Sequence, residues 1–71
     1  MKLTEKERLA FKYLAEGKRD KDTALLMGIS GPALRAVFYR AVKKLDAETK
    51  SHALAMIVKD DLAPKPPEGV D

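Results

Sequence analysis

The stretch from Ala24 to Leu34 constrains the fold more than any other part of this chain. It has a small residue at Ala24, a glycine at Gly28 and an apolar residue at Leu34. The alanine lets two helices approach closely, and the glycine can adopt a positive φ without a Cβ penalty. Ser30 then offers a hydroxyl that can cap the next helix. This spacing is typical of a helix-turn-helix, and an ordinary helical hairpin with no ligand is the alternative.

Length and composition favour one small intracellular domain. The 71 residues leave room for a single core, and the absence of cysteine excludes a disulfide framework and a thiolate zinc site. The longest strongly apolar stretch, residues 53–58, is far shorter than the roughly 20 residues that span a bilayer. The charged N-terminus also lacks an apolar signal core. We therefore expect a cytoplasmic protein with no membrane association.

The formal net charge of +3 is unevenly distributed along the chain. Residues 18–44 contain seven basic side chains and two acidic ones, whereas from Leu45 onward six acidic residues outnumber three lysines. The positive region coincides with the expected turn, which favours contact with a polyanion there. A solvated charged face without a ligand is the alternative interpretation.

Start and stop signals predict four helices. Thr4 and Glu7 form a capping box at the start of the first helix, which ends at Gly17. The third helix extends from about Pro32 to Leu45. The expected caps of the second, third and fourth helices are Asp20, Ser30 and Thr49.

The 3.6-residue period divides the third helix into two faces. The apolar face is expected to enter the core and consists of Leu34, Val37, Phe38, Ala41, Val42 and Leu45. The opposite face, which could enter a major groove, consists of Gly31, Pro32, Arg35, Ala36, Tyr39 and Lys43, with Arg40 and Lys44 beside it.

The other helices also have apolar faces that we expect to point inward. These residues are Leu3, Ala10, Phe11 and Leu14 in the first helix, Thr23, Ala24 and Met27 in the second, and Ala53, Leu54, Ile57 and Val58 in the fourth. Leu25 and Leu26 exceed what a simple surface helix needs, so one of them is expected to widen the core contact or to touch a partner.

Several stretches, in their order and spacing, resemble the LuxR/GerE-type helix-turn-helix domain of bacterial transcription regulators. The matching segments are Leu3-Thr4-Glu5-Lys6-Glu7, Leu14-Ala15-Glu16-Gly17-Lys18, Met27-Gly28-Ile29-Ser30, Lys43-Lys44-Leu45 and Thr49 to Val58. The resemblance implies that residues 1–62 form an all-α, four-helix domain that binds double-stranded DNA sequence-specifically and regulates transcription. Such domains commonly end a longer regulator, so this chain is either free-standing or part of a larger protein.

The resemblance also implies which residues face DNA. Bases and the adjoining backbone would be contacted by Arg35, Ala36, Tyr39 and Arg40, phosphates by Lys43 and Lys44, and the backbone near the second helix by Lys18, Arg19 and Lys21. The fourth helix often pairs in a two-fold dimer, and its outer strip suits that contact: His52, Ala55, Met56 and Lys59. An ordinary surface is the alternative for this strip.

Two departures from the family pattern reduce the number of side chains expected to contact bases. Ala33 stands where Thr is usual and Val37 where a polar residue such as His is common, so two polar contacts are missing. Base readout then depends mainly on Arg35 and Tyr39, while Ala36 can only contact a thymine methyl.

Three further departures from the family pattern concern the residues that support the expected DNA-binding face. Gly31-Pro32 supplies no side-chain donor at the start of the third helix. Asp46 stands where Gly is usual, so the turn after this helix is expected to be altered or strained. Thr23 replaces a large aliphatic residue, which predicts a less stable core there.

The end of the chain is rich in proline. Residues 63–71 contain three prolines and are expected to form a disordered tail, with a PxxP ligand as the alternative.

The sequence has none of the common signatures of an enzyme. The chain has no cysteine, no paired histidine and carboxylate and no glycine-rich phosphate loop, so we expect no catalysis, cofactor, metal or small-molecule ligand. The alternative function is a protein-binding regulator that pairs with a larger relative, which the missing polar contacts and the extra leucines favour.

Overall fold

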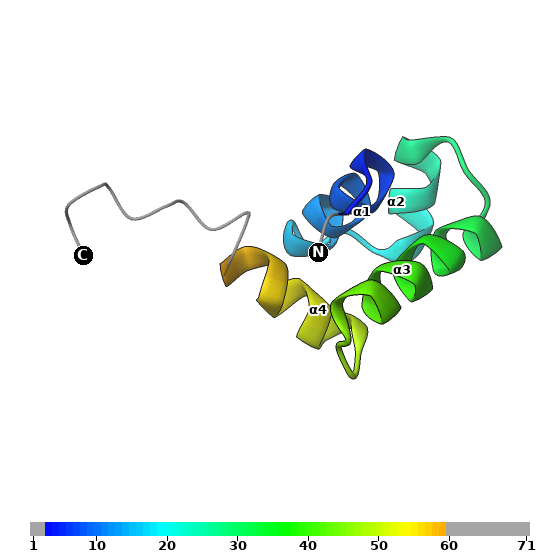
Figure 1. Cartoon of the computed structure of the whole chain (residues 1–71). Coiled ribbons are helices and arrows are strands. Elements are labelled where there is room, and N and C mark those ends of the chain that lie inside the picture. Colours follow the sequence, from blue (N-terminus) through cyan, green and yellow to red (C-terminus); the bar gives the residue numbers. More distant parts are fainter. Residues whose placement is uncertain (1–2, 60–71) are drawn as a thin grey trace.

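The computed structural model describes residues 3–59, which form four α-helices and no β-strand (Figure 1). The helices are α1 Glu5–Ala15, α2 Asp20–Met27, α3 Gly31–Leu45 and α4 Lys50–Ile57. The long helix α3 contacts each of the others. Figure 1 shows α1 and α2 together on one side of α3, with α4 leaving the C-terminal end of α3 at an angle. The expectation of an all-α chain is confirmed for these residues, and the predicted tail at 63–71 lies outside them.

Helix α1 begins with the capping box that the sequence predicts. The Glu7 backbone N–H donates to Thr4 Oγ1 at 3.1 Å, and the Thr4 backbone N–H donates to Glu7 Oε1 at 2.9 Å. These two bonds satisfy N–H groups that have no partner within the helix. After the helix ends, Gly17 has a φ of +86°.

The turn between α2 and α3 has the predicted left-handed glycine. Gly28 has φ +70° and ψ +32°, and the Ile29 N–H donates to the Ala24 carbonyl at 3.0 Å, which closes the end of α2. Ser30 Oγ then accepts from the Ala33 N–H at 3.2 Å and caps α3. α3 therefore leaves the turn in a fixed direction relative to α2.

One predicted cap is wrong. Arg19 occupies the N-cap position of α2 without a side-chain hydrogen bond, and Asp20 is the first residue of the helix. Asp20 and Asp22 still lie in the first turn, where their charges favour the positive end of the helix dipole. Asp20 also accepts from Lys50, whose Nζ is 3.3 Å from Oδ1.

The turn between α3 and α4 depends on an aspartate in a conformation that usually favours glycine. Asp46 has φ +56°, the one positive φ at a non-glycine residue between positions 3 and 59. The turn after α3 was expected to be altered or strained at this position, and the structure shows Asp46 in the left-handed conformation there. Thr49 Oγ1 accepts from the His52 N–H at 3.0 Å, and His52 Nδ1 accepts from the Glu48 N–H at 3.1 Å, so two side chains cap α4.

The core lies where all four helices meet. Its buried apolar residues are Ala10, Phe11, Ala24, Leu34, Val37, Phe38, Ala41, Ala53 and Ile57. The Phe11 and Phe38 rings pack edge to face with their centroids 5.0 Å apart. Thr23, at 1% exposure, is also buried.

The predicted inward faces agree with this core in most positions. Leu3, Leu14, Met27, Val42, Leu45 and Leu54 pack against it while partly buried. Val58 was expected to point inward, and this is wrong: it is 38% exposed and follows the last residue of α4. Leu25 and Leu26, at 71% and 55% exposure, do not widen the core contact.

In the part of the chain from 3 to 59, no helix has both the length and the apolar character that a bilayer crossing requires.

Candidate nucleic-acid interface

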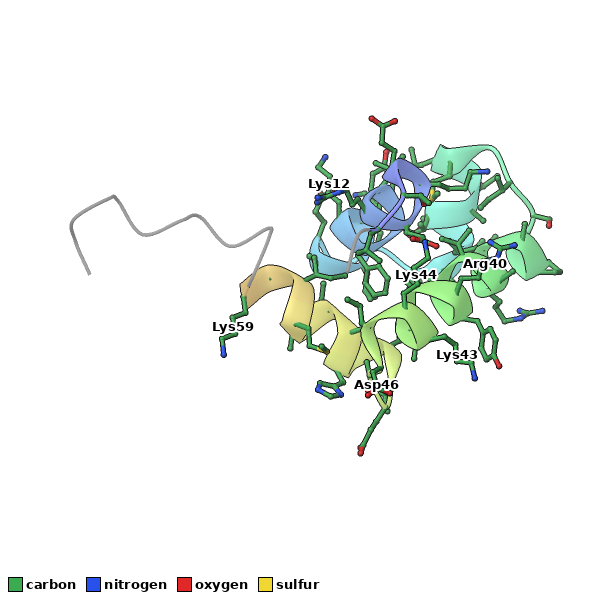
Figure 2. All side chains as sticks on the ribbon, in the orientation of Figure 1. Lys12, Arg40, Lys43, Lys44, Asp46 and Lys59 are labelled. Carbon is green, nitrogen blue, oxygen red and sulfur yellow. The ribbon has the colours of Figure 1, made fainter. Side chains whose placement is uncertain are left out.

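The outward face of α3 carries three long side chains spaced one helical turn apart. Arg35, Tyr39 and Lys43 follow an i, i+4, i+8 pattern, and all three are exposed. Lys43 Nζ lies 5.4 Å from the centroid of the Tyr39 ring, within the range of a cation–π interaction. Figure 2 shows Lys43 pointing away from the other helices. The apolar face of α3 is held in the core, so this row projects from a rigid support.

Ala36 and Arg40 flank this row. Ala36 is half-buried, and Arg40 is exposed. Arg40 and Lys44 are one turn apart and therefore share a side of α3. The structure thus brings together the residues predicted for base contact, with Arg40 at the margin of the row.

A second group of cations comes from the α1–α2 connection and the first turn of α2. Lys18, Arg19 and Lys21 are all exposed. A groove of about 420 Å³ separates the start of α2 from the start of α3, and Lys21 and Arg35 both border it. The Gly28 turn therefore places a cation of α2 across a groove from the first long side chain of α3.

Lys44 has a different environment from its neighbour Lys43. Its Nζ donates to Glu7 Oε1 at 2.8 Å, the oxygen that also accepts from the Thr4 N–H. Figure 2 shows Lys44 directed back toward α1. The Lys44 side chain is 32% exposed and that of Glu7 only 4%. Lys44 therefore joins the last turn of α3 to the first turn of α1, and contact with a phosphate would require it to leave a buried carboxylate.

The pKa of Glu7 lies below its ordinary value of 4.5. Burial of the carboxyl group opposes ionisation and raises the pKa. The hydrogen bonds from Lys44 and from the Thr4 backbone, together with the positive charge of Lys44, outweigh burial and lower it. The folded chain therefore stabilises the ionised form of Glu7.

Acid is expected to weaken the fold through this carboxylate. A lowered folded-state pKa means that the stability contributed by Glu7 is present above its ordinary pKa of 4.5 and is lost as the pH falls through the lowered value. Urea unfolding at a series of pH values should show this loss in the native chain and a smaller loss in Glu7→Gln. Identical pH dependence in the two proteins would contradict the assignment.

The outer strip of α4 is only partly a free surface. Ala55 and Lys59 are exposed, and Met56 is half-buried. His52 is exposed, but its ring nitrogen Nδ1 accepts from the Glu48 N–H and so completes the cap of α4. The predicted dimer contact stays a prediction, with a structural role added for His52.

Comparison with known proteins adds no further evidence. The chain matches no protein-family model, no curated protein and no solved structure.

Sequence reasoning missed two contacts that shape the site. Lys44 and Glu7 are 37 positions apart, and Lys50 and Asp20 are 30 positions apart. Lys50 Nζ also lies 4.5 Å from the centroid of the Phe38 ring. A single sequence carries no local signal for such pairs. The helical period places Glu7 on the same side of α1 as Leu3, Ala10 and Phe11, and this was the one available indication that a cation had to reach it.

Proposed function

We propose that this chain binds double-stranded DNA sequence-specifically, as a helix-turn-helix transcriptional regulator of the LuxR/GerE type, with α3 in the major groove. One observation carries the proposal: a left-handed glycine turn and a capped start of α3 hold Arg35, Tyr39 and Lys43 outward in one row. The row lies beside Lys21 of α2, across a shared groove. An α-helix with such a face fits the width of the major groove.

The proposed roles follow from the chemistry of each side chain. Arg35 has the planar fork that pairs with guanine O6 and N7, and Tyr39 and Ala36 lie beside it for contact with base edges. Lys43 and Arg40 contact phosphates on one side of the groove, and Lys18, Arg19 and Lys21 contact the backbone on the other. Lys44 remains paired with Glu7. In this proposal Ala55 and Met56 of α4, with Lys59 after its end, pair two copies on a palindromic site.

Selection of bound sequences from a random duplex pool provides the first test, followed by affinity measurements over a range of salt concentrations. Arg35→Ala should cost roughly 1–3 kcal/mol on the selected site and relax the base preference, because a bidentate contact is lost. Lys43→Gln should weaken binding to all sequences alike and reduce the salt slope by about one unit.

Lys12→Gln is the matched control for these variants. Lys12 is exposed on α1, away from the proposed face, and its ion pair with Glu16 is at the surface. This variant should retain both the affinity and the salt slope of the native chain. A native chain that shows no affinity for any duplex at moderate salt would exclude the proposal.

A second candidate function is favoured by the exposure of two large apolar side chains on α2. Leu25 and Leu26 are 71% and 55% exposed and border a hollow of about 330 Å³ with Lys18 and Asp22. In this alternative the chain is a protein-binding regulator that pairs with a larger relative of the same fold. A chain that binds no duplex but forms a defined complex with such a relative, lost in Leu25→Glu, would favour this function instead.

A further inference from the structure

The polar chemistry of α3 is unusually restricted for a helix that faces bases. From Gly31 to Leu45 it contains no Asn, Gln, Asp, Glu, Ser, Thr or His. Its polar side chains are two arginines, two lysines and one tyrosine. The hydroxyl nearest the start of the helix, on Ser30, already accepts from the Ala33 N–H.

This composition leaves two bases without a matching side chain. Adenine is read in the major groove by the paired donor and acceptor of an Asn or Gln amide, and the cytosine amino group by a carboxylate. α3 has neither group. An arginine fork matches guanine, and apolar side chains match the thymine methyl, which is the one apolar group that a base pair presents there.

The geometry assigns the guanine contact and the thymine methyl contact to adjacent positions of α3. Arg35 is the first long side chain of the outward row and its one arginine, so it is the guanine reader of that row. Ala36 lies next to it, and Tyr39 lies one turn further on with its side chain 63% exposed. Side chains one turn apart are about 5–6 Å from each other, a separation that lies between one and two base-pair steps of about 3.4 Å each.

The Tyr39 ring is exposed and can make an apolar contact with a base. Lys43 Nζ lies 5.4 Å from the ring centroid, which helps to hold the ring in place. A tyrosine hydroxyl both donates and accepts, so its hydrogen bond discriminates weakly between bases. The ring and the Ala36 methyl are the parts of this surface that can distinguish thymine.

We propose that α3 directly reads guanine through Arg35 and thymine methyl groups through Ala36 and Tyr39, so that adenine and cytosine are specified only through their pairing partners. This inference rests on the proposed DNA binding and names its preferred target. The target is a duplex whose contacted bases are a guanine flanked within about two steps by methyl-bearing pyrimidines.

Removal of single methyl groups from the selected duplex tests this inference. Each thymine is replaced in turn by deoxyuridine, which keeps every hydrogen-bonding group of the base. Loss of a contacted methyl should weaken binding about fourfold, the equivalent of one buried methyl group. Replacing the same T·A pair with C·G should also weaken binding, and 5-methylcytosine in that pair should restore part of the loss.

Two protein variants, each measured with the thymine and the deoxyuridine duplexes, test which side chain contacts the methyl group. In Tyr39→Ala, deoxyuridine at one position should no longer have any effect, because the partner of that methyl is gone. In Lys12→Gln, which changes an exposed side chain on α1, the deoxyuridine effect should match that of the native chain. Both variants replace exposed residues, so the fold should be retained.

The outcomes separate this inference from the proposed function. Sequence-specific binding with equal affinity for thymine and deoxyuridine duplexes at every position would overturn the inference and leave the proposed function in place. Absence of duplex binding would overturn both. A methyl effect that persists unchanged in Tyr39→Ala at every position would remove Tyr39 from the assignment.

Discussion

Replacement of Lys44 by methionine is expected to lower the free energy of unfolding by about 2–3 kcal/mol. Methionine keeps much of the apolar stem of lysine but leaves the Glu7 carboxylate without the cation at 2.8 Å. Glu7 is 3% exposed, so water cannot replace the lost partner fully. The Lys44 side chain itself is 32% exposed, which places the cost below the roughly 3–5 kcal/mol of a fully buried pair.

Urea unfolding of three variants measures this effect. Lys43→Met removes a neighbouring charge from an exposed position and should change stability by less than about 0.5 kcal/mol. Glu7→Gln combined with Lys44→Met removes the stranded charge and should recover part of the loss. Equal stability of Lys43→Met and Lys44→Met would contradict the structural role of Lys44.

Replacement of Phe11 by alanine is expected to cost about 3–5 kcal/mol. Phe11 is fully buried, and its ring packs edge to face on Phe38 at 5.0 Å. The variant loses both this contact and the burial of the ring, and a core relaxes only partially around such a cavity. A domain of this size has a total stability of about 4–10 kcal/mol, so a large part of the fold should be lost.

Far-ultraviolet circular dichroism with urea unfolding measures the change. Phe11→Leu fills more of the space and should be clearly less destabilising than Phe11→Ala. Leu25→Ala truncates a residue that is 71% exposed and should have almost no effect. If Leu25→Ala destabilised the chain as strongly as Phe11→Ala, the described core would be wrong.

The local structure could be predicted because its causes are local. Thr4 with Glu7, Gly28 with Ser30, and Thr49 each act within four residues, so their caps and turns follow from the sequence alone. The two faces of α3 follow equally from its 3.6-residue period, since Leu34, Val37, Phe38 and Ala41 are buried and Arg35, Tyr39 and Lys43 are exposed.

The features that could not be predicted depend on how the helices pack. The start of α2 differs from the prediction by one residue, because the β-region backbone of Arg19 rather than the side chain of Asp20 defines the cap. Val58 follows the apolar period of α4 but lies just after its last residue and is exposed. The helical period places Lys44 beside the outward face that carries Lys43, but its pairing with Glu7 follows only from the approach of α1 to the end of α3.

The position of Lys50 has a consequence for any attempt to shorten the chain. Its ammonium group covers the Phe38 ring and also pairs with Asp20, so one side chain at the start of α4 touches both the aromatic centre of the core and the first turn of α2. A peptide that stopped before Thr49 would expose that ring to water and also lose Ala53 and Ile57. The last helix is therefore an integral part of the folding unit, and a three-helix fragment would not be a minimal version of it.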